Sequence, residues 1–318
     1  MNQAFKIILS ILLSLISLSG CQSEPTQPLR IALNPWPGYE MLFLAKQKGF
    51  FEQVGLDVEL VRVSSLADTQ RAYLNGRVDG LTSTLIEAIQ IQAFSIKPLK
   101  VVLVTDFSLG GDVIIANKTI KSVADLKGKN VGAPVSSLGI YVLQRGLQSA
   151  SLSLEDIKVI NVEQTSGVKE MNNQRVSAFV TYPPVSVELL KNPNHHIIFD
   201  SAQIPKEIVD VISISDSYLN QYPATQTKLW QAWQKAYLYL EQNPDDAKAI
   251  MAEQLGLSNE EFSETLSSLQ LMSGEQQSNT IEDPFLRSVA KQICNTLLQI
   301  NSIDKPCDFV SQMFYVSK

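Results

Sequence analysis

The chain has 318 residues and a formal net charge of −6, with 45% hydrophobic and 18% charged residues. The length suits one large or two small domains, and the composition is that of a globular protein rather than a disordered one. Because no basic cluster offsets the acidic balance, the sequence argues against a nucleic-acid-binding protein.

The N-terminus has the pattern of a secretory signal peptide. Lys6 precedes the apolar run Ile7–Ile16, and small residues follow at Ser19 and Gly20. A basic start, a short apolar segment and small residues at the cleavage point are typical of exported proteins. The apolar run is too short for a stable membrane span. We therefore predict that residues 1–20 are removed on export.

The predicted cleavage point carries a second signal. Leu18-Ser19-Gly20-Cys21 resembles a bacterial lipobox, which implies cleavage before Cys21 and lipidation of its thiol. Residues 21–28 would then form a polar tether to the membrane. The alternative is ordinary signal cleavage next to an incidental cysteine.

Short apolar runs alternate with helical patterns from residue 29 to residue 200. Such alternation favours an α/β protein with parallel sheets covered by helices on both faces. Two series, residues 29–105 and 112–200, are each near the size of a small domain. The predicted strands are Leu29–Leu33, Leu56–Val61, Val78–Thr82, Leu99–Thr105, Asp112–Ala116, Asn130–Ala133, Ile157–Val162, Val176–Thr181 and Ile197–Phe199.

The last third of the chain is predicted to be helical, apart from one strand. Val209–Ile214 has a strand pattern, and we expect it to return to the first series. Everything after Asp216 is predicted to be helix or connection. The helices are expected at Lys228–Gln242, Pro244–Gln254, Asn259–Leu271 and Pro284–Ile300.

Two cysteines remain after the predicted cleavage, Cys294 and Cys307. In an oxidising compartment a disulfide closing that short loop is one interpretation, and two buried thiols are the other. His195 and His196 are adjacent and have no cysteine nearby, so no zinc pattern exists. We predict neither a metal site nor a cofactor.

One stretch resembles a known family. Asn34-Pro35-Trp36-Pro37-Gly38-Tyr39, followed by Ala45-Lys46-Gln47-Lys48-Gly49-Phe50-Phe51, resembles the opening of the nitrate/sulfonate/taurine-type substrate-binding proteins of ABC importers, the SsuA/THI5-like group. The Ala-x-x-x-Gly-Phe-Phe end is the most specific part. The resemblance continues to about residue 255 and is weak beyond it.

The resemblance implies a periplasmic-binding-protein type II fold with two α/β lobes and a helical C-terminal tail. Lobe 1 would comprise residues 29–106 and 207–318, and lobe 2 residues 107–206. Two hinge crossovers would join the lobes around a cleft that closes on a ligand. The implied function is to capture a small polar solute outside the cytoplasm and deliver it, as a monomer, to an ABC permease and ATPase.

In open α/β sheets, ligands lie at the carboxyl ends of the strands, so the loops there are the first candidates. In lobe 1, Trp36 and Tyr39 are predicted to form one wall of the site, or else to pack within their own lobe. Glu40 could contact the ligand or only complement a helix dipole. Ser83 could donate to a ligand or cap a helix. Asp106 could bind a cationic group.

Five further candidates come from lobe 2 and the first hinge. Asp112 could bind ligand or order the crossover through backbone N–H groups. Ser136, Ser137 and Tyr141 belong to a loop and helix start that suit an anionic group, since helix N-termini present free N–H groups. The alternative for these serines is ordinary capping. Tyr182 occupies a place where the family often has a ligand-facing aromatic residue.

These candidates combine aromatic rings, acids and one helix end suited to an anion. That mixture favours a zwitterion or a polar nitrogen heterocycle over a bare anion such as nitrate, because no Lys or Arg lies in these loops. A sulfonate such as taurine and a pyrimidine both remain open. The alternatives for function are a periplasmic ligand sensor and an enzyme of the thiamine-pyrimidine synthase type. The latter needs a Cys-rich segment and a reactive His that this sequence lacks.

Overall fold

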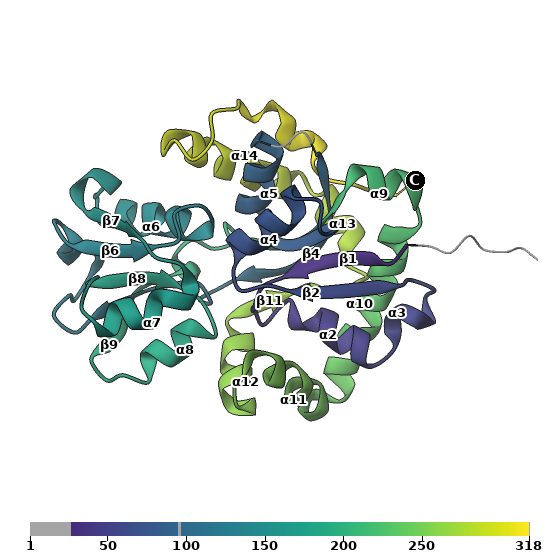
Figure 1. Cartoon of the computed structure of the whole chain (residues 1–318), viewed down its shortest axis with the longest axis horizontal. Helices are drawn as coiled ribbons and strands as arrows, with labels where there is room; N and C mark the ends of the chain where they lie inside the picture. The colour runs from purple at the N-terminus through teal and green to yellow at the C-terminus, as the bar shows by residue number, and fades with distance from the viewer. Residues whose placement is uncertain (1–26, 95–96, 318) are drawn as a thin grey trace, which may run out of the picture.

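The computed structural model describes residues 27–94 and 97–317, which form two α/β lobes that lie next to each other (Figure 1). The predicted signal peptide and the lipidation of Cys21 lie outside the described residues. Within the described ranges, no helix has both the length and the apolar character needed to cross a membrane.

Lobe 1 is built on a six-stranded sheet with the order β11-β4-β10-β3-β1-β2. Helices cover both faces of this sheet. Helices α4 (Leu66–Leu74) and α5 (Leu85–Phe94) lie on one face, and α2 (Glu40–Gln47) and α10 (Thr225–Gln242) lie on the other (Figure 1). The strands are β1 (Leu29–Leu33), β2 (Val58–Arg62), β3 (Gly80–Thr84), β4 (Leu99–Ser108), β10 (Val209–Ser215) and β11 (Leu269–Leu271).

The helices of lobe 1 come from both ends of the chain. They are α2 (Glu40–Gln47), α3 (Phe50–Gln53), α4 (Leu66–Leu74), α5 (Leu85–Phe94), α9 (Asp216–Gln221), α10 (Thr225–Gln242), α11 (Pro244–Leu255), α12 (Asn259–Ser267), α13 (Gln277–Glu282) and α14 (Pro284–Gln299). A disulfide joins Cys294 in α14 to Cys307, with an S–S distance of 2.00 Å.

Lobe 2 is built on a five-stranded sheet with the order β7-β6-β8-β5-β9. Its strands are β5 (Val113–Asn117), β6 (Asn130–Ala133), β7 (Lys158–Asn161), β8 (Ala178–Thr181) and β9 (His195–Asp200). Its helices are α6 (Leu138–Ser149), α7 (Gln164–Asn172) and α8 (Val185–Leu190).

Both sheets are mixed, so the prediction of parallel sheets is wrong in one respect. In lobe 1, β10 runs antiparallel to β3 and β4, and in lobe 2, β5 runs antiparallel to β8 and β9. These are the two strands by which the chain enters each lobe from the other one. Each of these strands starts at the side of the sheet where its neighbours end, so it must run antiparallel to them. The two crossovers therefore place the amino ends of β5 and β10 beside the carboxyl ends of β1, β3 and β8.

Two boundaries differ from the prediction near the first crossover. Strand β4 continues through Asp106 to Ser108, beyond the expected end at Thr105. The predicted helix Asn259–Leu271 ends at Ser267, and Leu269–Leu271 forms β11, which pairs with β4. The extra length of β4 gives β11 its partner, and β11 covers a strand edge that would otherwise be free. Local sequence preference was overridden by this long-range pairing.

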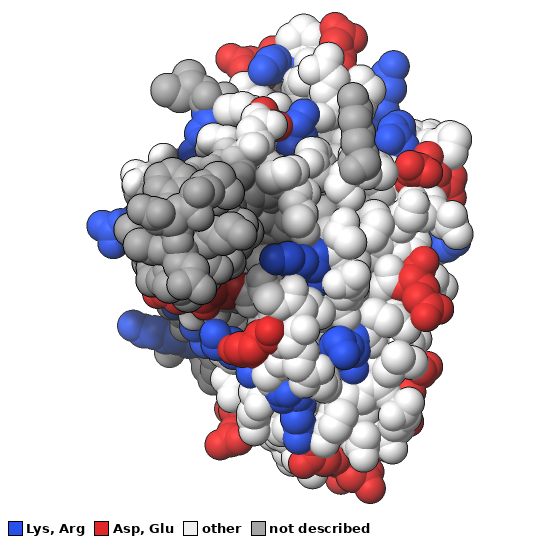
Figure 2. Space-filling model, turned by 90° about the vertical axis from the view of Figure 1, so that its right-hand side faces the viewer, with Lys and Arg blue, Asp and Glu red and all other residues white. Residues whose placement is uncertain are grey.

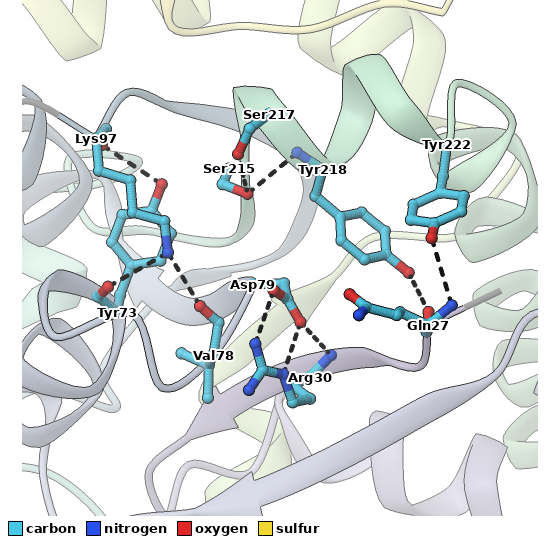
Figure 3. Close-up of polar contacts among 10 residues, drawn as sticks. All are labelled: Gln27, Arg30, Tyr73, Val78, Asp79, Lys97, Ser215, Ser217, Tyr218 and Tyr222. Carbon is cyan, nitrogen blue, oxygen red and sulfur yellow. Dashed lines mark hydrogen bonds and ion pairs between the residues drawn. The ribbon is translucent and has the colours of Figure 1, made fainter.

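The start of β1 lies at the end of lobe 1 that points away from lobe 2 (Figure 1), and polar contacts fix it there (Figure 3). Tyr218 donates its hydroxyl to the carbonyl of Gln27 at 3.0 Å, and the Gln27 N–H approaches the Tyr222 hydroxyl at 3.4 Å. Arg30 makes two side-chain hydrogen bonds to Asp79, at 2.9 and 3.0 Å. The chain therefore joins lobe 1 at the end that is far from lobe 2. On that end face, acidic and basic residues are interspersed (Figure 2).

Candidate functional site

A narrow pocket with about 10 Å³ of internal space lies between the two lobes. That space is about the size of one water molecule, so a solute fits only when the surrounding side chains or the lobes move apart. Its lining contains acidic, aromatic and neutral residues, and no Lys, Arg or His. The lining residues are Asn34, Trp36, Tyr39, Leu66, Thr84, Asp112, Leu138, Tyr182 and Asp210.

Strand ends bring these residues together. Asn34 follows β1, Thr84 ends β3 and Tyr182 follows β8, so three parallel strands contribute their carboxyl ends. Asp112 precedes β5 and Asp210 lies at the start of β10, so the two antiparallel strands contribute their amino ends. The cavity is therefore a direct consequence of the two crossovers between the lobes.

Three aromatic side chains form its walls. The Trp36 and Tyr182 rings meet edge to face, with centroids 5.9 Å apart and an interplanar angle of 84°. The Trp36 and Tyr39 centroids are 6.4 Å apart. Because Trp36 belongs to lobe 1 and Tyr182 to lobe 2, this contact holds the lobes in a closed arrangement. Aromatic faces at this position can accept a flat ring or a cation.

Asp106 lies behind Trp36 and orients its indole ring. The indole N–H points at both carboxylate oxygens, at 3.3 Å each, and the Thr105 hydroxyl donates to Oδ2 at 2.9 Å. Burial raises the pKa of Asp106 to about 7, although these hydrogen bonds oppose the shift. A Cβ atom on Gly38 would lie 2.0 Å from Asp106 Oδ2, so the tight approach of the loop requires glycine.

Asp210 is the direct neighbour of Asp106, since the two residues pair across β10 and β4. Tyr39 donates its hydroxyl to Asp210 Oδ1, and the Asp210 side chain also forms a hydrogen bond with the Asp106 side chain. Burial raises the pKa of Asp210 well above its usual value, and the charges of Asp106 and Asp112 raise it further. The two buried carboxyl groups are thus joined through a proton that one of them carries.

Asp112 is the least satisfied acid of the site. Its side chain is buried, and the hydrogen-bonding group beside it among the described residues is the Ser108 side chain. Burial raises its pKa to about 7, a hydrogen bond with the Ser108 side chain opposes that shift, and the charges of Asp106 and Glu87 raise the pKa further. Buried charges are almost always paired, so an exception at a cavity wall indicates a place for a missing partner.

Glu87 completes a group of four buried acids with Asp106, Asp112 and Asp210. It lies in the first turn of α5 and accepts hydrogen bonds from the Thr84 N–H at 2.8 Å and hydroxyl at 2.7 Å. Its other oxygen accepts the Leu138 N–H at the start of α6, at 2.6 Å. Burial raises the pKa of Glu87. The helix end that we expected to suit a ligand anion is therefore in contact with a carboxylate of the chain itself.

Among the predicted site residues, Trp36, Tyr39, Asp112 and Tyr182 line the cavity, and Asp106 lies directly behind it. Ser83 lies in β3 rather than after it, and its hydroxyl has no hydrogen-bond partner among the described residues.

The two serines before α6 lie at the contact between the lobes. The Ser136 carbonyl accepts a hydrogen bond from Gln70 of lobe 1, at 3.1 Å. Ser137 precedes α6 without capping it through its side chain. Neither serine is among the residues that line the cavity.

Glu40 and Tyr141, which were predicted to contact the ligand, have polar partners outside the cavity. Glu40 is buried and paired with Arg62, at 2.6 and 3.1 Å, so its charge is already balanced within lobe 1. Tyr141 donates its hydroxyl to Glu207 near the second crossover, at 2.9 Å. Both residues follow a strand in the sequence, which is where ligand-binding residues are expected. Their side chains, however, bind Arg62 and Glu207 rather than facing the cavity.

Residues that the sequence reasoning missed include Asn34, Thr84, Glu87 and Asp210. Asn34 directly follows the first predicted strand and was passed over for the aromatic residues after it. Thr84 and Glu87 have the spacing of a capping box, which signals a helix start but not a contact to another lobe. Asp210 lies at the amino end of a strand, whereas the rule for α/β sheets places ligand-binding residues at the carboxyl ends. Within residues 27–94 and 97–317, no group of three or more His, Cys, Asp and Glu side chains is arranged to hold a metal ion.

Comparisons with known proteins agree with this architecture. The periplasmic aliphatic sulphonate binding protein SsuA from Escherichia coli has a similar structure, with a TM-score of 0.77 at 18% identity over 93% of this chain and 94% of its own. The periplasmic nitrate-binding protein NrtA from Synechocystis matches with a TM-score of 0.73 at 12% identity, over 91% of this chain and 85% of its own. The chain therefore has the fold of type II periplasmic binding proteins, as predicted.

The sequence comparisons identify the family. The family model described as NMT1/THI5 like matches residues 36–247, and the chain belongs to this family. A formylaminopyrimidine-binding protein of Halalkalibacterium halodurans is 23% identical over 260 residues, which cover 78% of each chain.

Proposed function

We propose that this protein captures a small cationic, nitrogen-containing solute between its lobes and delivers it unchanged to an ABC importer. The observation that carries the proposal is Asp112, a buried carboxylate at the wall of the pocket that has the Ser108 side chain as its hydrogen-bond partner and forms no ion pair with a described Lys or Arg. A buried charge without an opposite charge is costly, and a bound cation is the natural compensation.

The electrostatics of the site disfavour an anionic solute. Asp106, Asp112, Asp210 and Glu87 are all at most 2% exposed, and no basic residue lines the cavity. An anion placed there would be repelled by those of these acids that are ionised, in a medium that screens charges poorly. Because sulfonates are anions, this preference for positive charge favours a nitrogen compound over a sulfonate as the solute.

The pattern of acceptors favours a solute with several N–H groups. Asn34 Oδ1 lacks a hydrogen-bond partner among the described residues, and Asp112 and Asp210 place carboxyl oxygens at the same pocket. Protonated aminopyrimidines and amidines are flat, carry several N–H donors, and can pack against the Trp36 and Tyr182 rings. The name of the formylaminopyrimidine-binding relative supports this class of solute.

The two lobes supply a means of capture and release. Trp36 touches Tyr182 and Gln70 bonds to Ser136, so the cavity is sealed by contacts that exist only when the lobes are together. Rotation about the two crossovers would break these contacts and open the cavity. An ABC permease and ATPase would receive the released solute, and a monomer is sufficient for this role.

The first test is a calorimetric titration of the mature protein with formylaminopyrimidine, benzamidine, ethanesulfonate and nitrate. We expect micromolar or tighter binding of at least one nitrogen cation and no binding of the two anions. Mass spectrometry of the recovered solute should show it unchanged. Binding of the anions alone, or chemical turnover of the solute, would contradict the proposal.

We further propose that the protein is held at the membrane from outside the cytoplasm by a lipid on Cys21. The tether would meet lobe 1 at Gln27, which Tyr218 and Tyr222 hold far from the cavity, so anchoring leaves the cavity free (Figure 3). Cys21→Ser should shift the exported protein from the membrane fraction to the soluble fraction, because one thiol carries the whole anchor. The measurement is a fractionation of bacteria that express each form. An unchanged distribution would remove the anchor.

A further inference from the structure

The contact between Glu87 and α6 joins residues of different lobes. Glu87 projects from α5 of lobe 1, and the Leu138 N–H that it accepts, at 2.6 Å, belongs to the first residue of α6 in lobe 2. The same carboxylate is held in place by the N–H and hydroxyl of Thr84. It is completely buried, so the contact is shielded from water. Such charge-assisted hydrogen bonds are stronger than neutral ones.

The start of α6 lacks the local group that normally satisfies a helix N-terminus. Ser137 stands at the capping position but makes no side-chain cap hydrogen bond, and no acidic residue lies in the first turn. A helix of 12 residues has free N–H groups and a positive dipole end there. Glu87 supplies the missing negative group from the other lobe.

We propose that Glu87 acts as a built-in anion, which latches lobe 1 to the start of α6 and closes that helix end to anionic solutes. The link between the lobes follows from the contacts alone. The exclusion of anionic solutes rests on the proposed function. One carboxylate thereby does two things when the lobes close. It stabilises the closed form, and it adds a negative charge beside a cavity that selects cations.

The latch predicts a specific response to a small carboxylate. Glu87→Ala leaves a space between Thr84 and Leu138 that acetate can fill, which would restore the lost hydrogen bonds. We expect acetate to raise the melting temperature of Glu87→Ala by several degrees in a saturable way. Wild type and Glu87→Gln, in which a side chain fills the space, should respond to acetate no more than to chloride at equal ionic strength. An equal response of all three proteins would overturn the latch.

A second variant keeps the proposal testable if Glu87→Ala does not fold. Glu87→Gln has nearly the same shape but no charge, so it holds the helix end less strongly. We expect it to bind formylaminopyrimidine at least tenfold more weakly than wild type. The control is Asp79→Asn, which removes an acid paired with Arg30 on the far side of lobe 1 and should stay within twofold (Figure 3). A Kd for Glu87→Gln within twofold of wild type would overturn the proposal.

The two experiments separate this inference from the proposed function. The acetate experiment needs no solute, so it tests the latch even if the solute class is wrong. If wild type binds none of the nitrogen cations but acetate still rescues Glu87→Ala, the latch stands and the proposed solute falls.

Discussion

Asp112→Asn should weaken the binding of a cationic solute by about 3–5 kcal/mol, which is two to four orders of magnitude in Kd. The effect is large because the carboxylate and the cation would both be buried, and the variant leaves the cation without its partner. Asp112 has the Ser108 side chain as a hydrogen-bond partner but forms no ion pair with a described Lys or Arg, so its charge is not already balanced within the protein. Calorimetric titration of both proteins at pH 8 measures the difference.

The same substitution should raise the stability of the protein without solute. Wild type buries an unpaired carboxylate at pH 8, and asparagine removes that charge at nearly constant volume. A higher melting temperature together with weaker binding is therefore the expected signature of Asp112.

Asp106→Asn is the matched comparison. It should cost a smaller 1.5–3 kcal/mol of binding, about the value of one charged hydrogen bond, because Asp106 acts by holding Trp36. Unchanged affinity in Asp112→Asn would remove this residue from the site.

The second large effect is a dependence of lobe closure on pH in the absence of solute. In the closed form burial raises the pKa of Asp106 and of Asp112 to about 7. In an open form water reaches both groups, and their pKa returns to about 3.8. Between these values the closed form binds more protons than the open form. Raising the pH from 4 to 7 must therefore disfavour closure, and the effect levels off above about 7.

The expected size makes this effect measurable. A carboxyl group whose pKa rises from 3.8 to about 7 contributes about 4 kcal/mol to the difference between the two forms. Because Asp106, Asp210 and Glu87 face Asp112, their contributions are not additive. Small-angle X-ray scattering should show a larger radius of gyration at pH 8 than at pH 5.

Two controls separate closure from other effects of pH. A bound cation should restore the smaller radius at pH 8, and Asp112→Asn should reduce the pH dependence. A wild-type radius that stays the same at pH 5 and pH 8 without solute would contradict the prediction.

Several features of the site could be predicted because they are local in the chain. Trp36 and Tyr39 follow the first strand, and Tyr182 follows the last parallel strand of lobe 2, so the strand-end rule places them at the cavity. Asp112 was found because it begins a strand next to the glycine pair of the first crossover. Aromatic and acidic residue types at these positions already favoured a nitrogen compound over a bare anion.

Other features depend on which elements meet in space. Asp210 stands beside Asp106 only because β10 enters the first sheet from the other lobe and runs antiparallel to β4. Glu40 and Tyr141 were assigned to the site by position, yet Arg62 and Glu207 bind their polar groups elsewhere. These partners are distant in the sequence, and no local pattern reveals such pairings.

Taken alone, the sequence determined the alternation of strands and helices, the family, and the loops from which the cavity walls come. Those properties follow from hydrophobic periodicity and turn residues, which act over a few neighbouring positions. Only the tertiary structure decided the direction of β5 and β10, the convergence of four acids, and the partner of the α6 N-terminus. The physical reason is that burial and charge at the cavity depend on contacts between lobes, and those contacts form only after the chain has crossed twice.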